Sequence, residues 1–251
     1  MPGIATGSSG RSWNILCDFD GTVTQDDVVD GLLERFGQPG WQALEDDWRA
    51  ELIGSRECMQ RQVALLDVSA QELDDYIDAV QIDPDFPNFA DAARSMGYRV
   101  SIISDGIDYA IHRILKRHRL SDLPVAANRL MPTTAPRRWR LTSPFEAAGC
   151  LSGTCKCARI LKARSQPGER ALLIGDGRSD FCASGAADFV FAKSRLIEHC
   201  RSEGAAHRPI AGFRAALELL PRLDSLAPAD PIDDPIDSTH PLYSLANNDS
   251  R

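Results

Sequence analysis

Long apolar runs are absent from this chain of 251 residues. No stretch reaches the roughly 18 apolar residues that a membrane-spanning helix needs. The Gly- and Ser-rich residues 1–12 also lack the apolar core of a secretory signal peptide. These absences argue against membrane-spanning and secreted proteins, so the sequence predicts a cytoplasmic protein without a membrane partner.

An excess of basic residues is absent as well. The formal net charge is −8, and residues 225–251 contribute −4 of it because they hold five Asp against one Arg. A surface without a basic excess argues against a nucleic-acid partner. The same residues 225–251 contain four prolines, which predicts a disordered acidic tail, and residues 1–12 are expected to be flexible.

The even set of cysteines that a disulfide framework needs is also missing, since the chain has seven. Free thiols are therefore expected, and Cys17 lies in an apolar stretch where packing explains it. Three other thiols, Cys150, Cys155 and Cys157, lie within eight residues. Zinc ligation and redox chemistry are both open for them, although the spacing is not a C-x2-C pair and no fourth ligand is evident.

What the chain does have is a short apolar run that ends in two carboxylates. Ile15, Leu16 and Cys17 lack amphipathic alternation, which is typical of a strand buried on both faces of a parallel sheet. Asp18 and Asp20 follow at the sheet edge where ligands bind in α/β folds. Two carboxylates this close repel each other unless one is protonated or a cation lies between them. We therefore expect a hard divalent cation there, Mg²⁺ above all.

Helical periodicity follows and then gives way to an alternation of helices and strands. Residues 25–82 carry four amphipathic segments, expected to form a small helical bundle, and Ser69 with Glu72 has the pattern of a capping box. Short apolar runs beyond them predict strands at residues 98–104, 124–130, 138–142, 171–174 and 189–192, with helices in between.

This order of elements predicts an α/β fold. Residues 13–24 and 83–224 would form a doubly wound parallel sheet of the Rossmann-like type. Residues 25–82 would be a four-helix cap, inserted after the first strand and placed over its carboxyl end.

Polar residues also follow the other predicted strands. Ser104, Asp105 and Gly106 come after one of them, and a hydroxyl followed by glycine and a helix N-terminus suits a phosphate oxygen. Asp176 and Asp180 follow another, which crowds carboxylates into one crevice. A bound metal explains such crowding, because buried unpaired charge is strongly unfavourable.

Lys156 opens a predicted helix, where the helix dipole disfavours a cation that does not face an anion. With it, the run D-F-D-G-T-V-T at 18–24, Ser104 and the run G-D-G-x-S-D at 175–180 resemble the haloacid dehalogenase-type phosphatase superfamily across residues 13–220. The cap insertion and A-N-R-L at 127–130 resemble its phosphoserine-phosphatase-like branch. Within that branch, D-F-D-G-T-V-T-Q-D-D and G-T-C-K-C at 153–157 look most like the methionine-salvage phosphatases of 2-hydroxy-3-keto-5-methylthiopentenyl-1-phosphate.

The resemblance implies a Mg²⁺-dependent phosphatase that hydrolyses a small phosphorylated metabolite through an aspartyl-phosphate. By that resemblance Asp18 is the nucleophile, and Asp20 is the acid that protonates the leaving alcohol and then activates water. Lys156 offsets the charge of Asp18 and the phosphate.

The resemblance also implies two sets of binding residues. The phosphoryl group would be bound by Ser104, with Asp105 and Gly106 beside it. The metal ligands would be Asp18, the main-chain carbonyl of Asp20, Asp176 and Asp180.

Residues that would select the substrate depart from the phosphoserine phosphatases. Gln62 stands where those enzymes carry an Arg, and Asp27 stands where they carry a Glu, although Asp27 could equally cap the first cap helix. Asp105 replaces a Gly, and Arg178 and Ser179 replace a small residue and an Asn. Gln62 and Asp27 are therefore candidate substrate-binding residues, and a substrate other than phosphoserine is favoured.

Three functions follow from these observations. The first is the phosphatase of methionine salvage, and the second is the same chemistry on phosphoserine or another small metabolite. The third, from a different class, is a catalytically silent protein that binds a phosphorylated ligand. A complete set of buried charges argues against the third, because such charges are costly to keep without a role. A homodimer is compatible with the sequence.

Overall fold

The computed structural model of the protein describes residues 12–227. Seven strands form one sheet in these residues, in the order β4-β3-β2-β1-β5-β6-β7, with neighbours parallel except β3 and β4. The strands are β1 (Ser12–Cys17), β2 (Arg99–Ile107), β3 (Val125–Pro132), β4 (Trp139–Thr142), β5 (Glu169–Gly175), β6 (Phe189–Ala192) and β7 (His207–Pro209). The expected flexible N-terminus and acidic tail lie outside the described residues, apart from their innermost positions.

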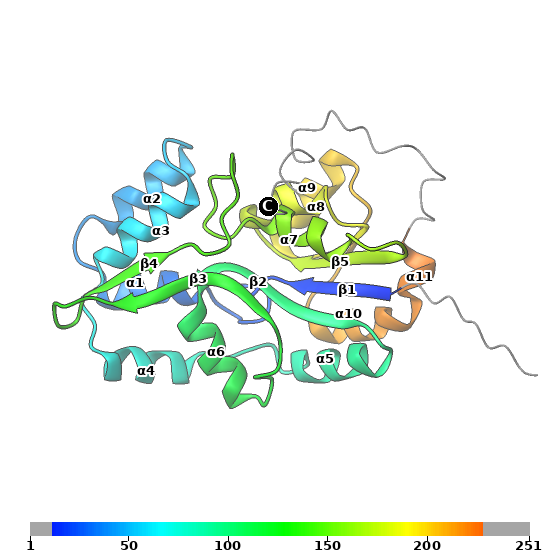
Figure 1. Ribbon diagram of the computed structural model, residues 1–251, viewed down its shortest axis with the longest axis horizontal. Helices are drawn as coiled ribbons and strands as arrows, with labels where there is room; N and C mark the ends of the chain where they lie inside the picture. The colour runs from blue at the N-terminus through cyan, green and yellow to red at the C-terminus, as the bar shows by residue number, and fades with distance from the viewer. Residues whose placement is uncertain (1–11, 228–251) are drawn as a thin grey trace, which may run out of the picture.

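Helices cover both faces of this sheet (Figure 1). The helices on one face are α4 (Ala70–Ala79), α5 (Phe86–Ser95), α6 (Asp108–Arg117) and α10 (Phe213–Leu219). Those on the other face are α7 (Lys156–Ala163), α8 (Phe181–Ser184) and α9 (Ser194–Glu203). A mostly parallel sheet with helices on both faces confirms the predicted doubly wound fold.

Within residues 12–227, each helix is too short or too polar to span a membrane.

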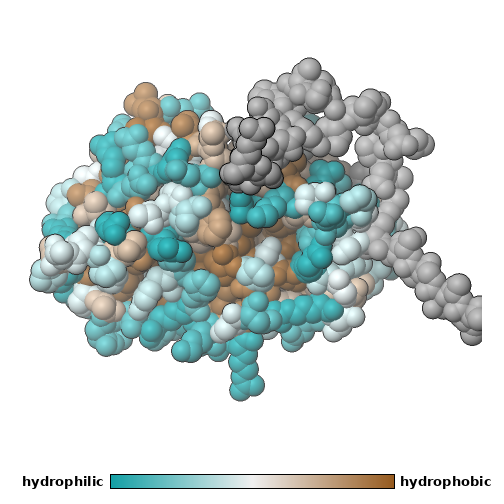
Figure 2. All heavy atoms as spheres, viewed as in Figure 1, coloured by the Kyte–Doolittle hydropathy of each residue, from teal (hydrophilic) through white to brown (hydrophobic). Residues whose placement is uncertain are grey.

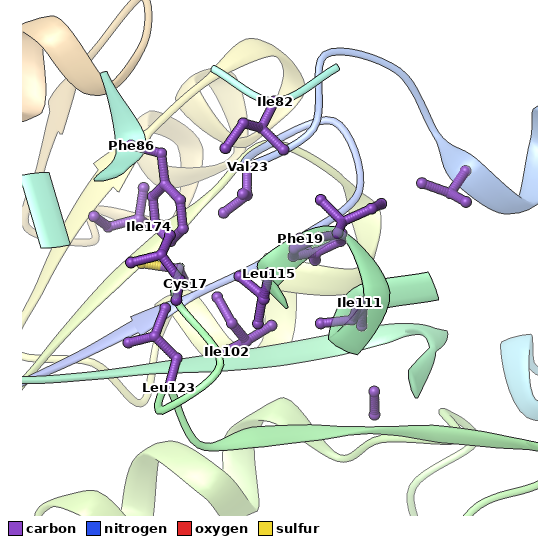
Figure 3. Packing of buried hydrophobic residues seen from close by; sticks show 14 of the residues in the cluster. Cys17, Phe19, Val23, Ile82, Phe86, Ile102, Ile111, Leu115, Leu123 and Ile174 are labelled. Carbon is purple, nitrogen blue, oxygen red and sulfur yellow. The ribbon is translucent and has the colours of Figure 1, made fainter. Parts of the chain in front are cut away.

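The central strand β1 contributes side chains to the hydrophobic cores on both faces of the sheet, because successive side chains of a strand point to opposite faces. Trp13, Ile15 and Cys17 are buried in one core, and Leu16 is buried in the other. Figure 3 shows Phe19, just beyond the strand, beside Leu115 of α6. On the face of the molecule seen in Figure 2, most exposed residues are polar, and a group of hydrophobic residues is exposed near the centre of the view. The predicted packing role of Cys17 is confirmed.

Four helices follow β1 within residues 25–82, as predicted: α1 (Val28–Phe36), α2 (Trp41–Arg49), α3 (Ser55–Ala64) and α4; α5 then leads to β2. The capping box of Ser69 and Glu72 begins α4. The four helices do not form one bundle, however. Helix α2 packs against α3, and α3 packs along β4, whereas α4 packs against α6 and α1 contacts both α4 and β2. Leu73 and Ile77 of α4 are buried in the same hydrophobic cluster as Ile111 of α6.

Three local features differ from the sequence-based expectation. Strand β2 continues past Ser104 to Ile107 through a register shift against β3. Helix α9 and the edge strand β7 were not expected, because α9 buries little apolar surface and β7 is three residues long and contains a proline. The remaining described helix is α11 (Leu223–Leu226).

Candidate active site

The carboxyl ends of β1, β2 and β5 meet at one edge of the sheet. Cys17 pairs with Ile102 of β2 and with Ile174 of β5, so the residues that follow these strands come together. A cavity of about 830 Å³ opens there between the sheet and the cap. Of the predicted site residues, its lining includes Asp18, Asp20, Asp27, Gln62, Ser104, Asp105, Gly106 and Asp176.

The buried ammonium of Lys156 joins the two acidic segments. Its Nζ lies 2.7 Å from Asp18 Oδ1 and 2.7 Å from Asp180 Oδ1, and donates to Ser179 Oγ at 2.9 Å. Burial alone would lower the pKa of Lys156, but the charges of Asp18 and Asp180 outweigh it and raise the pKa above its usual range. Lys156 is therefore a fixed cation that contacts Asp18 and Ser179, two residues of the cavity lining, and as predicted it opens helix α7.

Carboxylates outnumber the cation in this cluster. One oxygen from each of Asp18, Asp176 and Asp180 lies within 4.8 Å of the other two. Burial, followed by the charge of Asp180, raises the pKa of Asp18, and burial is also the main reason that the pKa of Asp176 is raised. Three hard oxygen donors close together fit a small divalent cation such as Mg²⁺. The side chain of Asp20 does not belong to this group.

Asp20 instead faces the cap and Ser104. Its Oδ1 accepts a hydrogen bond from the Val28 N–H at 3.1 Å, and its Oδ2 accepts one from the Ser104 hydroxyl at 3.3 Å. Burial, with the nearby charge of Asp27, raises the pKa of Asp20 to about 8. The carboxyl is therefore protonated near neutral pH and can donate a proton.

Glycines make room for these side chains. A Cβ on Gly106 would lie 2.2 Å from Asp20 Oδ2, and a Cβ on Gly21, whose φ is +70°, would lie 3.0 Å from Asp176 Oδ2. The Gly106 N–H donates to Ser104 Oγ at 2.9 Å. The expected helix does follow, since α6 begins at Asp108, but β2 continues to Ile107, so Ser104 lies within the strand and not at its end. Any phosphate contact here would come from the strand itself.

Asp105 lines the cavity, as expected of a substrate-binding residue, and both its carboxylate oxygens also contact protein groups. Oδ2 accepts from the Ser55 hydroxyl of α3 at 2.6 Å. Oδ1 accepts from the Thr154 N–H at 2.9 Å and from Asn128 Nδ2 at 3.1 Å. Asp105 thus connects the cap, β3 and the loop that carries Lys156. We propose that it acts as a positioning residue.

We expect the Asp105→Ala substitution to lower kcat/KM by about 10- to 100-fold, because a small displacement of Lys156 is costly to catalysis. Ser55→Ala removes only the cap contact and should cost less than about tenfold on the same physical grounds. Steady-state kinetics measures both effects, and thermal unfolding checks that each variant is folded. Unchanged activity of a folded Asp105→Ala protein would contradict this role.

Asp27 and Gln62 line the cap side of the cavity, and both also serve the cap itself. Asp27 Oδ1 accepts from the N–H groups of Val29 and Asp30 at 2.9 and 3.0 Å, so Asp27 is the N-cap of α1. Gln62 Nε2 donates to Glu45 Oε2 at 3.3 Å. Both residues can contact a substrate in the cavity while they keep these contacts. We propose that they take part in substrate binding.

Two residues that were not predicted as site residues make hydrogen bonds to the segment after β1 or to Asp176. Thr22 Oγ1 donates to Asp176 Oδ1 at 2.9 Å. Lys193 Nζ donates to the carbonyls of Gly21 and Thr22 at 2.9 and 3.2 Å. Lys193 directly follows β6, so its strand-end position was the available signal.

Arg178, which replaces a small residue of the phosphoserine phosphatases, contacts the cap. Its guanidinium contacts Glu51 at 2.6 Å and lies 5.3 Å from the centre of the Trp48 ring, both in the cap. Arg178 therefore links the segment after β5 to the α2 end of the cap.

Known proteins are similar to this chain in sequence and in fold. Residues 15–184 match the profile of the haloacid dehalogenase-like hydrolase family. A 2-hydroxy-3-keto-5-methylthiopentenyl-1-phosphate phosphatase of Exiguobacterium sp. is 29% identical over 206 residues, which cover 80% of this chain and 94% of that protein. A protein of the same name from Exiguobacterium sibiricum is 30% identical over 206 residues, covering 79% and 92%. A solved substrate-bound phosphoserine phosphatase complex superposes with a TM-score of 0.64 at 18% identity, over 83% of this chain and 98% of that one.

Proposed function

The chain belongs to the haloacid dehalogenase-like hydrolase family and is a phosphomonoester hydrolase. From that premise we propose that it is a Mg²⁺-dependent phosphatase that forms an aspartyl-phosphate on Asp18. The observation that carries the proposal is the buried Lys156 between Asp18 and Asp180, beside a cavity that is lined by Asp18 and by Asp20, whose pKa is raised to about 8. Its proposed substrate is 2-hydroxy-3-keto-5-methylthiopentenyl-1-phosphate, which the names of similar proteins support.

In the first chemical step an oxygen of Asp18 forms a bond to phosphorus while the bond from phosphorus to the alcohol oxygen breaks. Lys156 holds Asp18 Oδ1 at 2.7 Å, so Oδ2 is the oxygen that attacks. Asp20 gives its proton to the leaving alcohol. The Ser104 hydroxyl, oriented by the Gly106 N–H, binds a phosphoryl oxygen. When Mg²⁺ is bound by Asp18, Asp176 and Asp180, it would neutralise charge on the phosphoryl group.

In the second step water replaces Asp18 on phosphorus. Asp20, now ionised, takes a proton from the attacking water, and the bond between phosphorus and Asp18 breaks. Free phosphate leaves, and both carboxyl groups return to their starting states. Lys156 remains hydrogen-bonded to Asp18 throughout and stabilises the carboxylate that is released.

The cap side of the cavity favours an uncharged substrate chain over a carboxylate. It presents three carboxyl groups, those of Asp27, Asp30 and Glu45, and one cap arginine, Arg49, which already pairs with Glu45 at 3.2 Å. The excess of acidic groups would repel the carboxylate of phosphoserine. Burial and then the charges of Asp27 and Glu45 raise the pKa of Asp30 to about 7. The hydroxyl and keto groups of the proposed substrate carry no such charge. Apolar contacts for its methylthio group are available from Val29, Trp48 and Met59.

The test is phosphate release from four esters: p-nitrophenyl phosphate, phosphoserine, phosphocholine and 2-hydroxy-3-keto-5-methylthiopentenyl-1-phosphate. Each is measured with Mg²⁺ and with excess EDTA. We expect Mg²⁺-dependent hydrolysis with at least about a tenfold higher kcat/KM for the salvage ester than for phosphoserine. A preference for phosphoserine would refute the proposed substrate. A preference for phosphocholine would mean that the acidic wall selects a cation.

A failure to hydrolyse any of the four esters would instead favour the silent-binding alternative. Equilibrium binding of the salvage ester to the unreactive protein would then distinguish a binding module from an enzyme whose substrate is outside the panel.

We also expect a pH limit that is set by Asp20. Because the acid form is required in the first step and its pKa is about 8, kcat should fall about tenfold per pH unit well above that value. Asp20→Asn should remove this alkaline limb and reduce activity on alkyl phosphates far more than on p-nitrophenyl phosphate, whose leaving group needs little protonation. The measurement is a pH–rate profile of both proteins on both esters. An unchanged alkaline limb in Asp20→Asn would assign it to another group.

A further inference from the structure

Four thiols gather beside the active-site lysine, and the proposed phosphatase chemistry uses none of them. Cys150 and Cys155 lie in the loop before α7, Cys157 lies in the first turn of α7, and Cys182 lies in α8, which packs against α7. All four are free. Cys155 and Cys157 are buried, Cys150 is half-buried and Cys182 is exposed. The structure therefore supplies the fourth thiol, Cys182, that was not evident in the sequence.

Contacts between these thiols run in series. The thiol of Cys155 contacts those of Cys150 and Cys157, and Cys157 contacts Cys182 in turn. Cys155 is also the N-cap residue of α7, where the helix dipole favours negative charge. The two neighbouring thiols, with the charge of Arg159, lower the pKa of Cys155 against the opposing effect of burial. These surroundings favour the thiolate, the reactive form of cysteine.

The serial arrangement suits thiol oxidation better than metal ligation. Four sulfurs around a zinc ion lie about 2.3 Å from it and so converge on one point. Within residues 12–227, however, the group of metal-ligating side chains whose donor atoms all lie within 4.8 Å of one another consists of the three aspartates and no thiols. Neighbouring sulfurs that meet in pairs are the arrangement that disulfide formation requires.

We propose that Cys150 and Cys155 form a reversible redox pair that closes to a disulfide beside Lys156. Cys150 is the more accessible partner, since it is half-buried in the loop, whereas Cys157 is buried in the first turn of α7, where an oxidant reaches it less easily. The oxidant is a low-molecular-weight disulfide such as oxidised glutathione.

The exchange proceeds in two balanced steps. The Cys155 thiolate attacks the disulfide of glutathione, so a mixed disulfide forms and one glutathione thiolate leaves. The Cys150 thiol then loses its proton, attacks the Cys155 sulfur and displaces the second glutathione. Two protein thiols are oxidised, and one oxidised glutathione is reduced to two molecules of the thiol.

Closure of this disulfide would move the main chain that positions Lys156. Cys155 directly precedes Lys156, its N–H donates to the Phe145 carbonyl at 2.9 Å, and the neighbouring Thr154 N–H donates to Asp105 at 2.9 Å. Drawing Cys155 toward Cys150 would disturb both contacts. The oxidised protein should therefore lose activity at least about threefold, a shift of the size expected from slight misplacement of a catalytic group. This second part rests on the proposed function, whereas formation of the bond does not.

The test equilibrates the full-length protein in glutathione redox buffers, blocks free thiols by alkylation and maps tryptic peptides by mass spectrometry. Cleavage after Arg140 and Lys156 gives the peptide 141–156, which contains Cys150 and Cys155 together, while Cys157 and Cys182 fall in other peptides. The expected result is an unalkylated peptide 141–156, lighter by the two hydrogens lost on disulfide formation. Cys150→Ser should abolish this product, and Cys200→Ser, a buried thiol outside the cluster, should leave it unchanged.

Other outcomes overturn the proposal. A bond between Cys157 and Cys182 would assign a different pair, and stoichiometric zinc in the purified protein would assign metal ligation instead. The activity of oxidised protein, before and after dithiothreitol, is compared with that of Cys150→Ser treated in the same way. Formation of the 150–155 bond with unchanged activity would overturn the coupling to Lys156, and inactivity of the reduced protein would count against the proposed function alone.

Discussion

Asp18→Asn is expected to lower kcat for phosphate release by about 10⁴-fold or more while the protein remains folded. The amide lacks the negative charge that attacks phosphorus, so the covalent intermediate no longer forms. Stability should be kept or increased in the absence of metal, because burial and Asp180 already raise the pKa of Asp18 and make its ionised form costly. The measurements are single-turnover kinetics with the salvage ester and thermal unfolding in EDTA.

The matched control for this variant is Asp91→Asn. Asp91 lies in α5 on the other side of the sheet, where it is exposed and pairs with Arg94. It should leave both kcat and stability unchanged, because exposed ion pairs contribute little. A folded Asp18→Asn protein that keeps a tenth of the wild-type kcat would rule out Asp18 as the nucleophile.

Lys156→Met is expected to lower the free energy of unfolding by about 3–5 kcal/mol without metal, because it leaves buried carboxylates uncompensated. Lys156, Asp18 and Asp180 are all buried, and the two ion pairs measure 2.7 Å each. The methionine fills the same space without charge, so the loss reports the electrostatic role. Urea unfolding at pH 7 measures it, provided that the slope with denaturant is unchanged.

Two comparisons make the Lys156 prediction specific. Lys162→Met, an exposed lysine of the same helix, should change stability by less than about 0.5 kcal/mol. The double variant Lys156→Met/Asp180→Asn should recover part of the loss, since residues in one charge network are not additive. A Lys156→Met protein as stable as wild type would mean that the carboxylates are neutral without the lysine.

The sequence was sufficient where the evidence is local. The run from Ile15 to Cys17 predicted the central strand, since an apolar stretch without alternation is buried on both faces whatever its neighbours are. Once the sheet is parallel, the carboxyl ends of its strands meet at one edge. For that reason the cluster of Asp18, Asp176 and Asp180 and the position of Lys156 at the start of a helix could be predicted from spacing alone.

Tertiary structure decided the partners of each side chain, because contacts between distant segments depend on strand register and helix packing that no local pattern specifies. Asp105 has the appearance of a ligand in sequence, yet Ser55, Thr154 and Asn128 surround its carboxylate in the fold. Helix α4 has the amphipathic pattern of a bundle helix, but in the fold it packs against α6, with Leu73 and Ile77 buried in the cluster that also contains Ile111 of α6. In the same way, the packing of α7 against α8 brings Cys182 to Cys157, two residues that are 25 positions apart in the chain.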